Sequence, residues 1–371
     1  MANVEVNRPR FYCDMISSFI KKGTAQNGNF DVTATAGDFI GLQNGTEAEL
    51  FDGRPTNVVD FDTSAGSQDK HVLITLAMPQ TISLNINFIA VLNHNMKSAD
   101  AKMRISTGDE STDIAAIDGA NAETSNYDWG NAPTEVLNAD VITRAGDSKS
   151  SIIIPANNGS TIILMEGSNP IDFRYVGIQF EGTLSQSSTA HGNGTFDANT
   201  DLQIGCIMVG TYYDMPHSPD MTLTNSIMFD DVKIRKSMGG QKYGLATNLG
   251  KSATNHAPFL FSGSSIGSHD LFYGRRAYDF AFSFINNTDL YPSEMSNVGT
   301  ELSGNDNSFI MDVWNRTLGG LLPFIFTVDK TSVGDEAESE YIFARFDQNS
   351  LDLNQVAHKL FNLRLKIIEE I

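Results

Sequence analysis

The stretch His71–Met96, which reads HVLITLAMPQTISLNINFIAVLNHNM, carries the clearest fold signal in the chain. Apolar residues occupy every second position up to Phe88, apart from a break at Pro79-Gln80. Because successive side chains of a strand leave opposite faces of the pleat, this alternation predicts half-buried β-strands. After Phe88 the pattern slips by one residue, which indicates either a β-bulge or a strand that is buried on both faces. His94, near the end of the run, is predicted to be a strand-end or turn residue.

Similar alternating segments recur along the chain between clusters of Gly, Asn, Ser and Asp, at residues 151–154, 161–165, 171–180, 202–213, 324–328 and 341–346. In RRAYDFAFSFINN (275–287), four aromatic residues at alternate positions, Tyr278 to Phe284, are predicted to share one core face. The last segment, KLFNLRLKIIEEI (359–371), fits a strand and a helix, and its polar alternation favours a strand. Helices are expected only at 15–22 and around 308–318. The sequence therefore predicts an all-β protein with few short helices.

A chain of 371 residues is too long for one ordinary core, so two domains are expected. Pro216 and Pro219 interrupt any strand ladder and place the boundary near residues 213–219. We predict an arm at 1–24 that pairs with the second domain or a neighbour, a first domain at 25–215 and a second at 216–371. Two long polar stretches, 185–200 and 286–307, are predicted to be surface loops with a functional or interface role.

The charge argues against a nucleic-acid partner. The formal net charge is −20, from 45 acidic and 25 basic residues. A phosphate-binding surface needs clustered Lys and Arg, whereas the tightest basic clusters, Lys233-Ile234-Arg235-Lys236 and Arg275-Arg276, are small and lie in acidic surroundings.

Targeting and membrane signals are also missing from the sequence. Residues 1–10 contain no apolar signal-peptide core, and no apolar run approaches the ~20 residues of a membrane helix. Cys13 and Cys206 are the only cysteines, without CxxC spacing, so no disulfide framework is expected, and Cys206 lies on an alternating strand face that predicts a core position. We therefore expect a protein made in a reducing cytoplasm and not secreted by a signal peptide.

Neither the serine motif, the histidines nor the Asp-rich segment meets the requirements of a catalytic or metal site. Gly263-Ser264-Ser265-Ile266-Gly267 has the nucleophile-elbow spacing, but that chemistry requires a strand, a turn and a helix on a parallel sheet, so a loop is favoured. The histidines do not pair at metal-ligand spacings. Asp197-Ala198-Asn199-Thr200-Asp201 resembles half of a calcium loop, but it lacks the glycine and the distal glutamate of an EF-hand. We expect no catalytic residue, no metal site and no cofactor.

Residues 31–213 resemble galactose-binding-like (discoidin-type) domains. The resemblance lies in LFDGRPT (50–56), the opening stretch, MRISTGDE (103–110) and YVGIQF (175–180), in that order. It implies a jelly-roll β-sandwich whose ligand residues would lie in loops at one end, although no loop motif allows a ligand residue to be assigned. Many such domains serve only as protein-contact modules.

Residues 205–371 resemble structural proteins of tailed bacteriophages. The segments that carry this resemblance are GCIMVGTYYDMPHSPDMTL (205–223), MFDDVKIRKSMGGQKYG (228–244), RRAYDFAFSFI (275–285), LGGLLPFIFTVD (318–329) and YIFARFD (341–347). They imply a second β-sandwich-like domain and a subunit of the tail, baseplate or fibre-attachment region. The expected partners are other virion proteins and copies of itself in a symmetric assembly, and the expected location is the virion.

A second hypothesis is a carbohydrate-binding module that recognises host surface glycans. Such sites need exposed aromatic rings beside polar side chains, and Tyr127-Asp128-Trp129 is the candidate. The same triplet could also be a loop aromatic packed back against the barrel.

Overall fold

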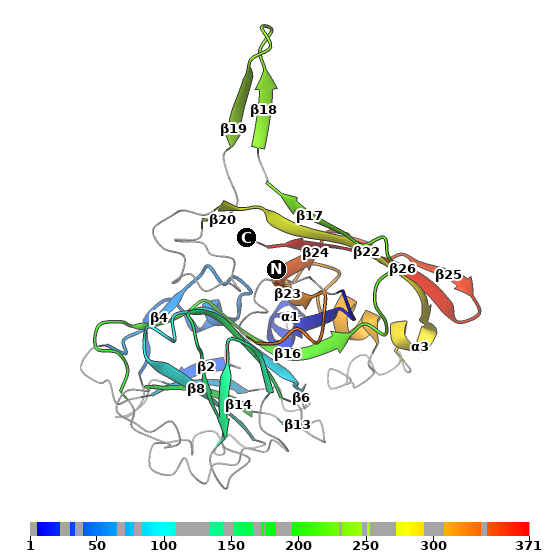
Figure 1. The fold of residues 1–371 in the computed structure, drawn as a ribbon. Helices are drawn as coiled ribbons and strands as arrows, with labels where there is room; N and C mark the ends of the chain where they lie inside the picture. The colour runs from blue at the N-terminus through cyan, green and yellow to red at the C-terminus, as the bar shows by residue number, and fades with distance from the viewer. Residues whose placement is uncertain are drawn as a thin grey trace.

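The structure is a computed structural model that describes residues 6–22, 30–33, 40–64, 71–77, 84–108, 134–143, 151–165, 172–173, 175–182, 195–229, 232–246, 251–252, 272–292, 308–334 and 340–370. Most of these residues form antiparallel sheets, with a few short helical segments between them (Figure 1). The prediction of an all-β protein with few short helices is therefore confirmed.

The largest sheet has eleven strands and contains segments from both ends of the chain. In spatial order they are β17 (Thr224–Met228), β22 (Arg275–Asn286), β26 (Leu360–Glu369), β24 (Tyr341–Phe346), β23 (Phe324–Thr327), β1 (Arg10–Asp14), β16 (Cys206–Asp214), β7 (Phe88–His94), β12 (Gly159–Leu164) and β9 (Thr134–Leu137), with β25 (Leu353–Ala357) also paired to β26.

A six-stranded sheet packs against one end of this large sheet. Its order is β10 (Asp140–Thr143), β11 (Ser151–Ile154), β8 (Ala101–Gly108), β14 (Tyr175–Gly182), β5 (Val72–Ala77) and β2 (Phe30–Thr33). The inward residues of β5, β8 and β14 share a buried apolar cluster with those of β7, β12 and β16. Burial of both inner faces holds the two sheets together as a β-sandwich.

Smaller elements complete the described chain. The minor strand pairs are β13 (Asp172–Phe173) with β6 (Leu84–Asn85), β18 (Val232–Lys236) with β19 (Lys242–Ala246) and β20 (Lys251–Ser252) with β21 (Phe272–Tyr273), and a three-stranded sheet contains β15 (Leu202–Ile204), β4 (Val59–Phe61) and β3 (Leu42–Asn44). The helical segments are α1 (Met15–Lys22), η1 (Glu47–Phe51), α3 (Asn287–Leu290) and η4 (Ile310–Asn315).

The opening stretch forms strands, but in more than one sheet. Its first part is β5, in which Val72, Ile74 and Leu76 are buried as the alternation predicts. The expected second strand is divided: within the described residues, β6 covers Leu84–Asn85 and pairs with β13, and β7 begins at Phe88 in the large sheet. The change of phase at Phe88 therefore marks the start of a strand in a different sheet.

Strand β7 is buried on both faces, one of the two alternatives that the pattern left open. Ile89 and Val91 belong to the core between the two sheets. Phe88, Ala90 and Leu92 belong to a second buried cluster on the opposite face of the large sheet. The strand ends at His94, as predicted.

The N-terminal strand β1 lies in the middle of the large sheet, between β16 and β23. Phe11 pairs with Tyr213 on one side and with Phe326 on the other, so β1 joins strands from the middle and the last thirds of the chain. The predicted pairing of the N-terminal arm with the later part of the chain is present in the β1–β23 ladder, while the three domain ranges stay a prediction.

Helix α1 follows β1 directly and has the predicted bounds, Met15–Lys22. Buried Asp14 caps it, because the backbone N–H groups of Ile16 and Ser17 donate to the Asp14 carboxylate at 3.2 and 2.9 Å. The Val209 N–H of β16 donates to the same carboxylate at 3.1 Å. Burial raises the pKa of Asp14, and these hydrogen bonds partly offset that effect.

A separate aromatic core lies on one face of the second half of the large sheet. Phe280 stacks on Phe326 with ring centroids 5.7 Å apart, and both rings are buried. Residues of α3 and η4 pack on this core, and η4 falls within the predicted helix at 308–318. The C-terminal segment is strand β26, as its alternation favours.

The prediction that Phe284 shares this core face is wrong. The β22–β26 pairing shifts register between Phe282 and Ile285, and Phe284 has a positive φ of 63°. The shift turns Phe284 outward, to 63% exposure, and gives the inner position to Ile285, which is 1% exposed. A β-bulge inserts such an extra residue, so the side chains that follow change face.

Candidate functional site

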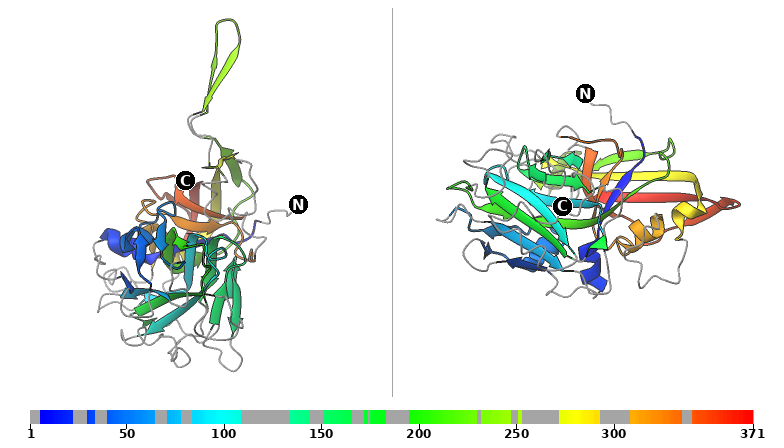
Figure 2. Two further views of the ribbon diagram at one scale, coloured as in Figure 1. Left: turned by 90° about the vertical axis from the view of Figure 1, so that its left-hand side faces the viewer. Right: turned by 90° about the horizontal axis from the view of Figure 1, so that it is seen from below.

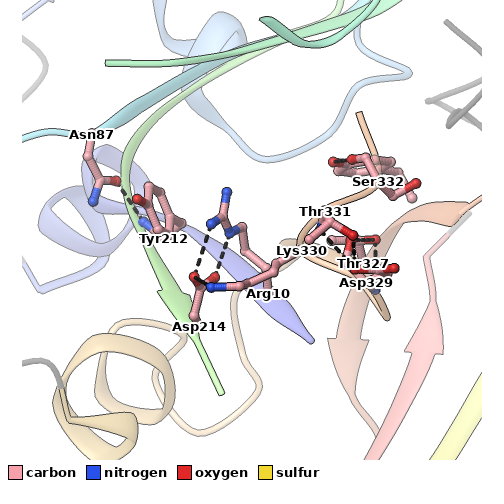
Figure 3. A network of polar contacts seen from close by, with 10 residues as sticks. Arg10, Asn87, Tyr212, Asp214, Thr327, Asp329, Lys330, Thr331 and Ser332 are labelled. Carbon is pink, nitrogen blue, oxygen red and sulfur yellow. Dashed lines mark hydrogen bonds and ion pairs between the residues drawn. The ribbon is translucent and has the colours of Figure 1, made fainter. Parts of the chain in front are cut away.

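A polar junction joins β1, β16 and the segment after β23 (Figure 3). Arg10 and Asp214 are directly paired residues at one end of β1 and β16. The Arg10 guanidinium donates two hydrogen bonds to the Asp214 carboxylate, from Nε at 2.5 Å and from Nη2 at 3.0 Å. Lys330 Nζ lies 3.2 Å from the same carboxylate. One acidic side chain therefore joins two cations from distant parts of the sequence.

Aromatic contacts also hold the Arg10 guanidinium in place. Its Cζ atom lies 4.0 Å from the centroid of the Tyr212 ring, within cation–π distance. Burial lowers the pKa of Arg10, but the hydrogen bond to Asp214 and neighbouring negative charge outweigh burial and raise this pKa above its usual value. The guanidinium therefore stays protonated, so Arg10 suits a structural role better than general acid–base catalysis.

The turn after β23 fixes the backbone beside Lys330 (Figure 3). Asp329 Oδ1 accepts hydrogen bonds from the backbone N–H and hydroxyl of Thr331, at 2.8 and 2.7 Å. The Tyr341 hydroxyl of β24 donates to the Ser332 carbonyl at 2.6 Å. These contacts fix the turn that carries Lys330, so the junction connects β1, β16 and the segment after β23.

Replacing Asp214 with Asn is expected to lower the free energy of unfolding by about 1–2 kcal/mol, because Arg10 loses a bidentate, charge-assisted partner. Lys330→Met removes a more exposed cation and should cost less than ~1 kcal/mol. Chemical denaturation of both variants measures the difference. Equal losses from the two substitutions would contradict a central role for the Arg10–Asp214 pair.

His94 is buried and has partners for both ring nitrogens. The Met96 N–H donates to Nδ1 at 3.3 Å, so the proton belongs on Nε2, which lies 2.9 Å from Thr161 Oγ1. The Thr161 hydroxyl in turn donates to the Asn138 carbonyl at 3.0 Å. Burial lowers the pKa of His94 to about 3. This neutral imidazole fixes the end of β7 and leaves no lone pair for a metal or a substrate proton.

The stability of the protein should fall in mild acid because of His94. Its pKa is about 3 in the folded state and 6.5 ordinarily, so between these values the unfolded chain binds the extra proton. Stability is therefore complete above the ordinary pKa and declines as the pH falls toward the folded one. We expect a loss of about 2 kcal/mol between pH 7 and pH 5 from this group.

His94→Asn, which keeps a short acceptor but does not titrate, should reduce this pH dependence. His358, exposed between β25 and β26, provides the matched control, and His358→Asn should retain the wild-type dependence. Denaturation at both pH values measures the effect. A wild-type slope in the His94 variant would show that His94 is not the group responsible.

A second polar cluster is buried in the six-stranded sheet. Glu181 of β14 pairs with Lys102 of β8, and Arg104 lies beside them. The Glu181 carboxylate accepts from Arg104 Nε at 2.5 Å and lies 3.6 Å from Lys102 Nζ. Burial lowers the pKa of Lys102, and the charge of Glu181 partly offsets that effect. The cluster therefore places one carboxylate beside two basic side chains in the interior of the protein.

The calcium-like segment uses its carboxylate oxygens for a local turn and for a contact with a distant segment. Asp197 Oδ1 accepts the Asn199 N–H at 2.8 Å, and Asp201 Oδ1 accepts the Ser64 N–H at 2.9 Å. In the part of the chain that the structure describes, no group of three His, Cys, Asp or Glu side chains could hold a metal ion. Cys13 and Cys206 are buried free thiols, and Cys206 occupies the predicted core position.

The remaining sequence candidates lie outside the described residues. They are the glycan candidates Tyr127, Asp128 and Trp129, and the serine motif at 263–267. Within the described ranges, each helix is too short or too polar to cross a membrane.

A hairpin of β18 and β19 projects away from the sheets (Figures 1 and 2). All five residues of β18 are exposed. The sequence identified Lys233-Ile234-Arg235-Lys236 only as a small basic cluster. Its alternating basic residues, followed by Gly239-Gly240, were the available signal for a ribbon with a tight turn.

Neither a protein family nor a curated protein matches the sequence of this chain. The class of protein that the fold defines is an all-β protein with a β-sandwich and a projecting hairpin.

Proposed function

We propose that this protein is a structural subunit that acts by binding other protein subunits in a symmetric assembly. The particular assembly that we propose is a tailed bacteriophage particle, in its tail, baseplate or fibre-attachment region. The sequence resemblances of residues 31–213 and 205–371 suggest this setting. The proposal gives the chain no catalytic role.

The projecting hairpin is the observation that carries the proposal. Ile234 and Tyr243 are 68% and 56% exposed on an element that stands away from the sheets (Figure 2). Isolated two-stranded hairpins are marginally stable, and exposed apolar surface on them favours association with a partner. A subunit whose contacts form on assembly has a use for such an element.

The body from which the hairpin projects also supports a structural role. The eleven-stranded sheet continues through strands from both halves of the chain, with buried apolar clusters on its two faces. The Arg10–Asp214–Lys330 junction reinforces this sheet where β1 enters it. Such a body can hold a protruding contact element at a fixed position relative to its neighbours.

Quantitative mass spectrometry and symmetry analysis of purified particles test the proposal. The chain should be present in the particle at a copy number that is a multiple of three or six, as expected for a component around the tail axis. Absence of the chain from complete particles would overturn the virion assignment.

The glycan-binding hypothesis keeps its place as the alternative proposal. Its candidate residues lie outside the described part of the chain, so the structure adds no observation in its favour.

A further inference from the structure

The hairpin β18–β19 has a well-formed end, although it projects from the sheets. The Ser237 N–H donates to the Gln241 carbonyl at 2.8 Å, and the Gly240 N–H donates to the Ser237 carbonyl at 2.9 Å. Gly240 has a φ of +86°, which glycine adopts without strain. The element is therefore a defined ribbon with a specific turn at its tip.

One face of the ribbon exposes apolar side chains. Directly opposite residues of an antiparallel pair share a face, so Val232 and Ile234 lie on one face with Gly244 and Ala246. Val232 is 43% exposed and Ile234 is 68% exposed. A partner that covers this face would remove apolar surface from water.

The ribbon is also strongly basic on an acidic protein. Residues 232–246 contain four basic side chains and no acidic one: Lys233, Arg235, Lys236 and Lys242. Because the net charge of the chain is −20 and the hairpin contributes +4, the remaining residues carry −24. A second copy of the chain therefore presents the opposite charge to this element.

The pairing within the ribbon favours the same partner chemistry. Lys236 and Lys242 are directly opposite each other next to the turn. Like charges at directly opposed positions destabilise a strand pair. Carboxylates of a neighbouring protein would neutralise this repulsion and stabilise the hairpin.

We propose that the hairpin of one copy docks on the acidic surface of a second copy. The contact joins different surfaces of the two copies, so repetition produces a ring or an open chain. This inference rests on the proposed assembly function and specifies which element makes the contact. Nucleic acid is the competing occupant of a basic ribbon, and the experiment below separates the two.

The test measures self-association of the full-length protein by sedimentation velocity. The wild-type protein should associate, and the association should weaken when NaCl is raised from about 0.05 M to about 0.5 M, because salt screens exposed charges. The triple variant Lys233→Glu, Arg235→Glu, Lys242→Glu should weaken association by about tenfold or more. The matched control reverses three exposed charges elsewhere, Arg8→Glu, Lys21→Glu and Lys97→Glu, and should associate like the wild type.

A variant with residues 232–246 replaced by a short Gly-Ser linker gives a second test. Since the hairpin is exposed, this variant should unfold at the wild-type temperature. It can receive a hairpin but cannot supply one, so adding it to the wild-type protein should shorten the assemblies.

The outcomes separate this inference from the proposed function. Wild-type association by the hairpinless protein would overturn hairpin docking and leave the assembly function in place. A wild-type protein that stays monomeric at every concentration and salt would also overturn self-docking, while the particle measurement still decides the assembly function. Hairpin-dependent binding of a labelled DNA duplex by a monomeric protein would assign the ribbon to nucleic acid instead.

Discussion

Glu181→Gln should lower the free energy of unfolding by about 3–5 kcal/mol, because it leaves buried cations without their carboxylate partner. Glu181 is fully buried, and its carboxylate accepts hydrogen bonds from Arg104 at 2.5 Å and from Gln179 at 3.1 Å. Lys102 Nζ lies 3.6 Å from the other carboxylate oxygen. The amide of Gln keeps the shape of the side chain and removes the charge.

The loss in Glu181→Gln should depend on pH with a defined sign. Burial lowers the pKa of Lys102 below its unfolded value of 10.5, and loss of the carboxylate lowers it further. Between the folded and the unfolded pKa of Lys102, the unfolded chain binds more protons than the folded chain. Stability therefore rises with pH over that range. The deficit of the variant should therefore be smaller at about pH 9.5 than at pH 7.

An exposed ion pair provides the control for Glu181. Asp279 accepts two hydrogen bonds from Arg364, at 2.8 and 2.7 Å, at the protein surface. Asp279→Asn should cost less than ~1 kcal/mol, because water screens and solvates exposed charges. Denaturant titrations of the two variants measure the contrast. Similar small losses from both would mean that the Glu181 charge is not required in the interior.

Gly210→Ala should be the most damaging single substitution at the centre of the large sheet, with an expected loss of about 3 kcal/mol or more. A Cβ atom at Gly210 would lie 2.1 Å from the Cys13 carbonyl oxygen and 3.0 Å from the Met15 nitrogen. Both contacts are with backbone, so the chain must move where β1 turns into α1. That movement would disturb the pairing of β1 with β16.

Gly244→Ala is the matched control for this prediction. Gly244 lies on the projecting hairpin, and a Cβ atom there would meet nothing within 4 Å. Its stability change should stay within ~0.5 kcal/mol. Thermal unfolding compares the two variants, and if Gly210→Ala fails to fold, its loss of soluble yield against Gly244→Ala gives the same information. Equal stabilities would refute the close approach of β1 to β16.

The elements that the sequence predicts well are those whose signal is local. Alternation located β5, and for β26 and β7 it narrowed the choice to two alternatives each, one of which the structure shows. The helix at Met15–Lys22 has its predicted bounds. Period-two and period-3.6 patterns depend only on residues close together in the chain, so a single sequence is enough to recognise them. The strand end at His94 was predictable for the same reason.

The errors and omissions involve partners that are distant in sequence. Phe284 fits the alternation of β22, but its orientation depends on the register with β26, about which the local pattern says nothing. The Arg10–Asp214 pair joins residues 204 positions apart, and no motif connects them. The basic hairpin was visible as a charge cluster, but its separation from the sheets is a tertiary property. The orientation of Phe284, the Arg10–Asp214 pair and the position of the hairpin therefore depend on contacts between distant residues, which local patterns do not encode.

The central position of β1 has a consequence for biosynthesis. Phe11 leaves the ribosome 315 residues before its partner Phe326. Until then, one side of β1 has no strand to receive its backbone hydrogen bonds, and such open edges favour aggregation of nascent chains. Completion of the large sheet is thereby delayed until β23 has been translated.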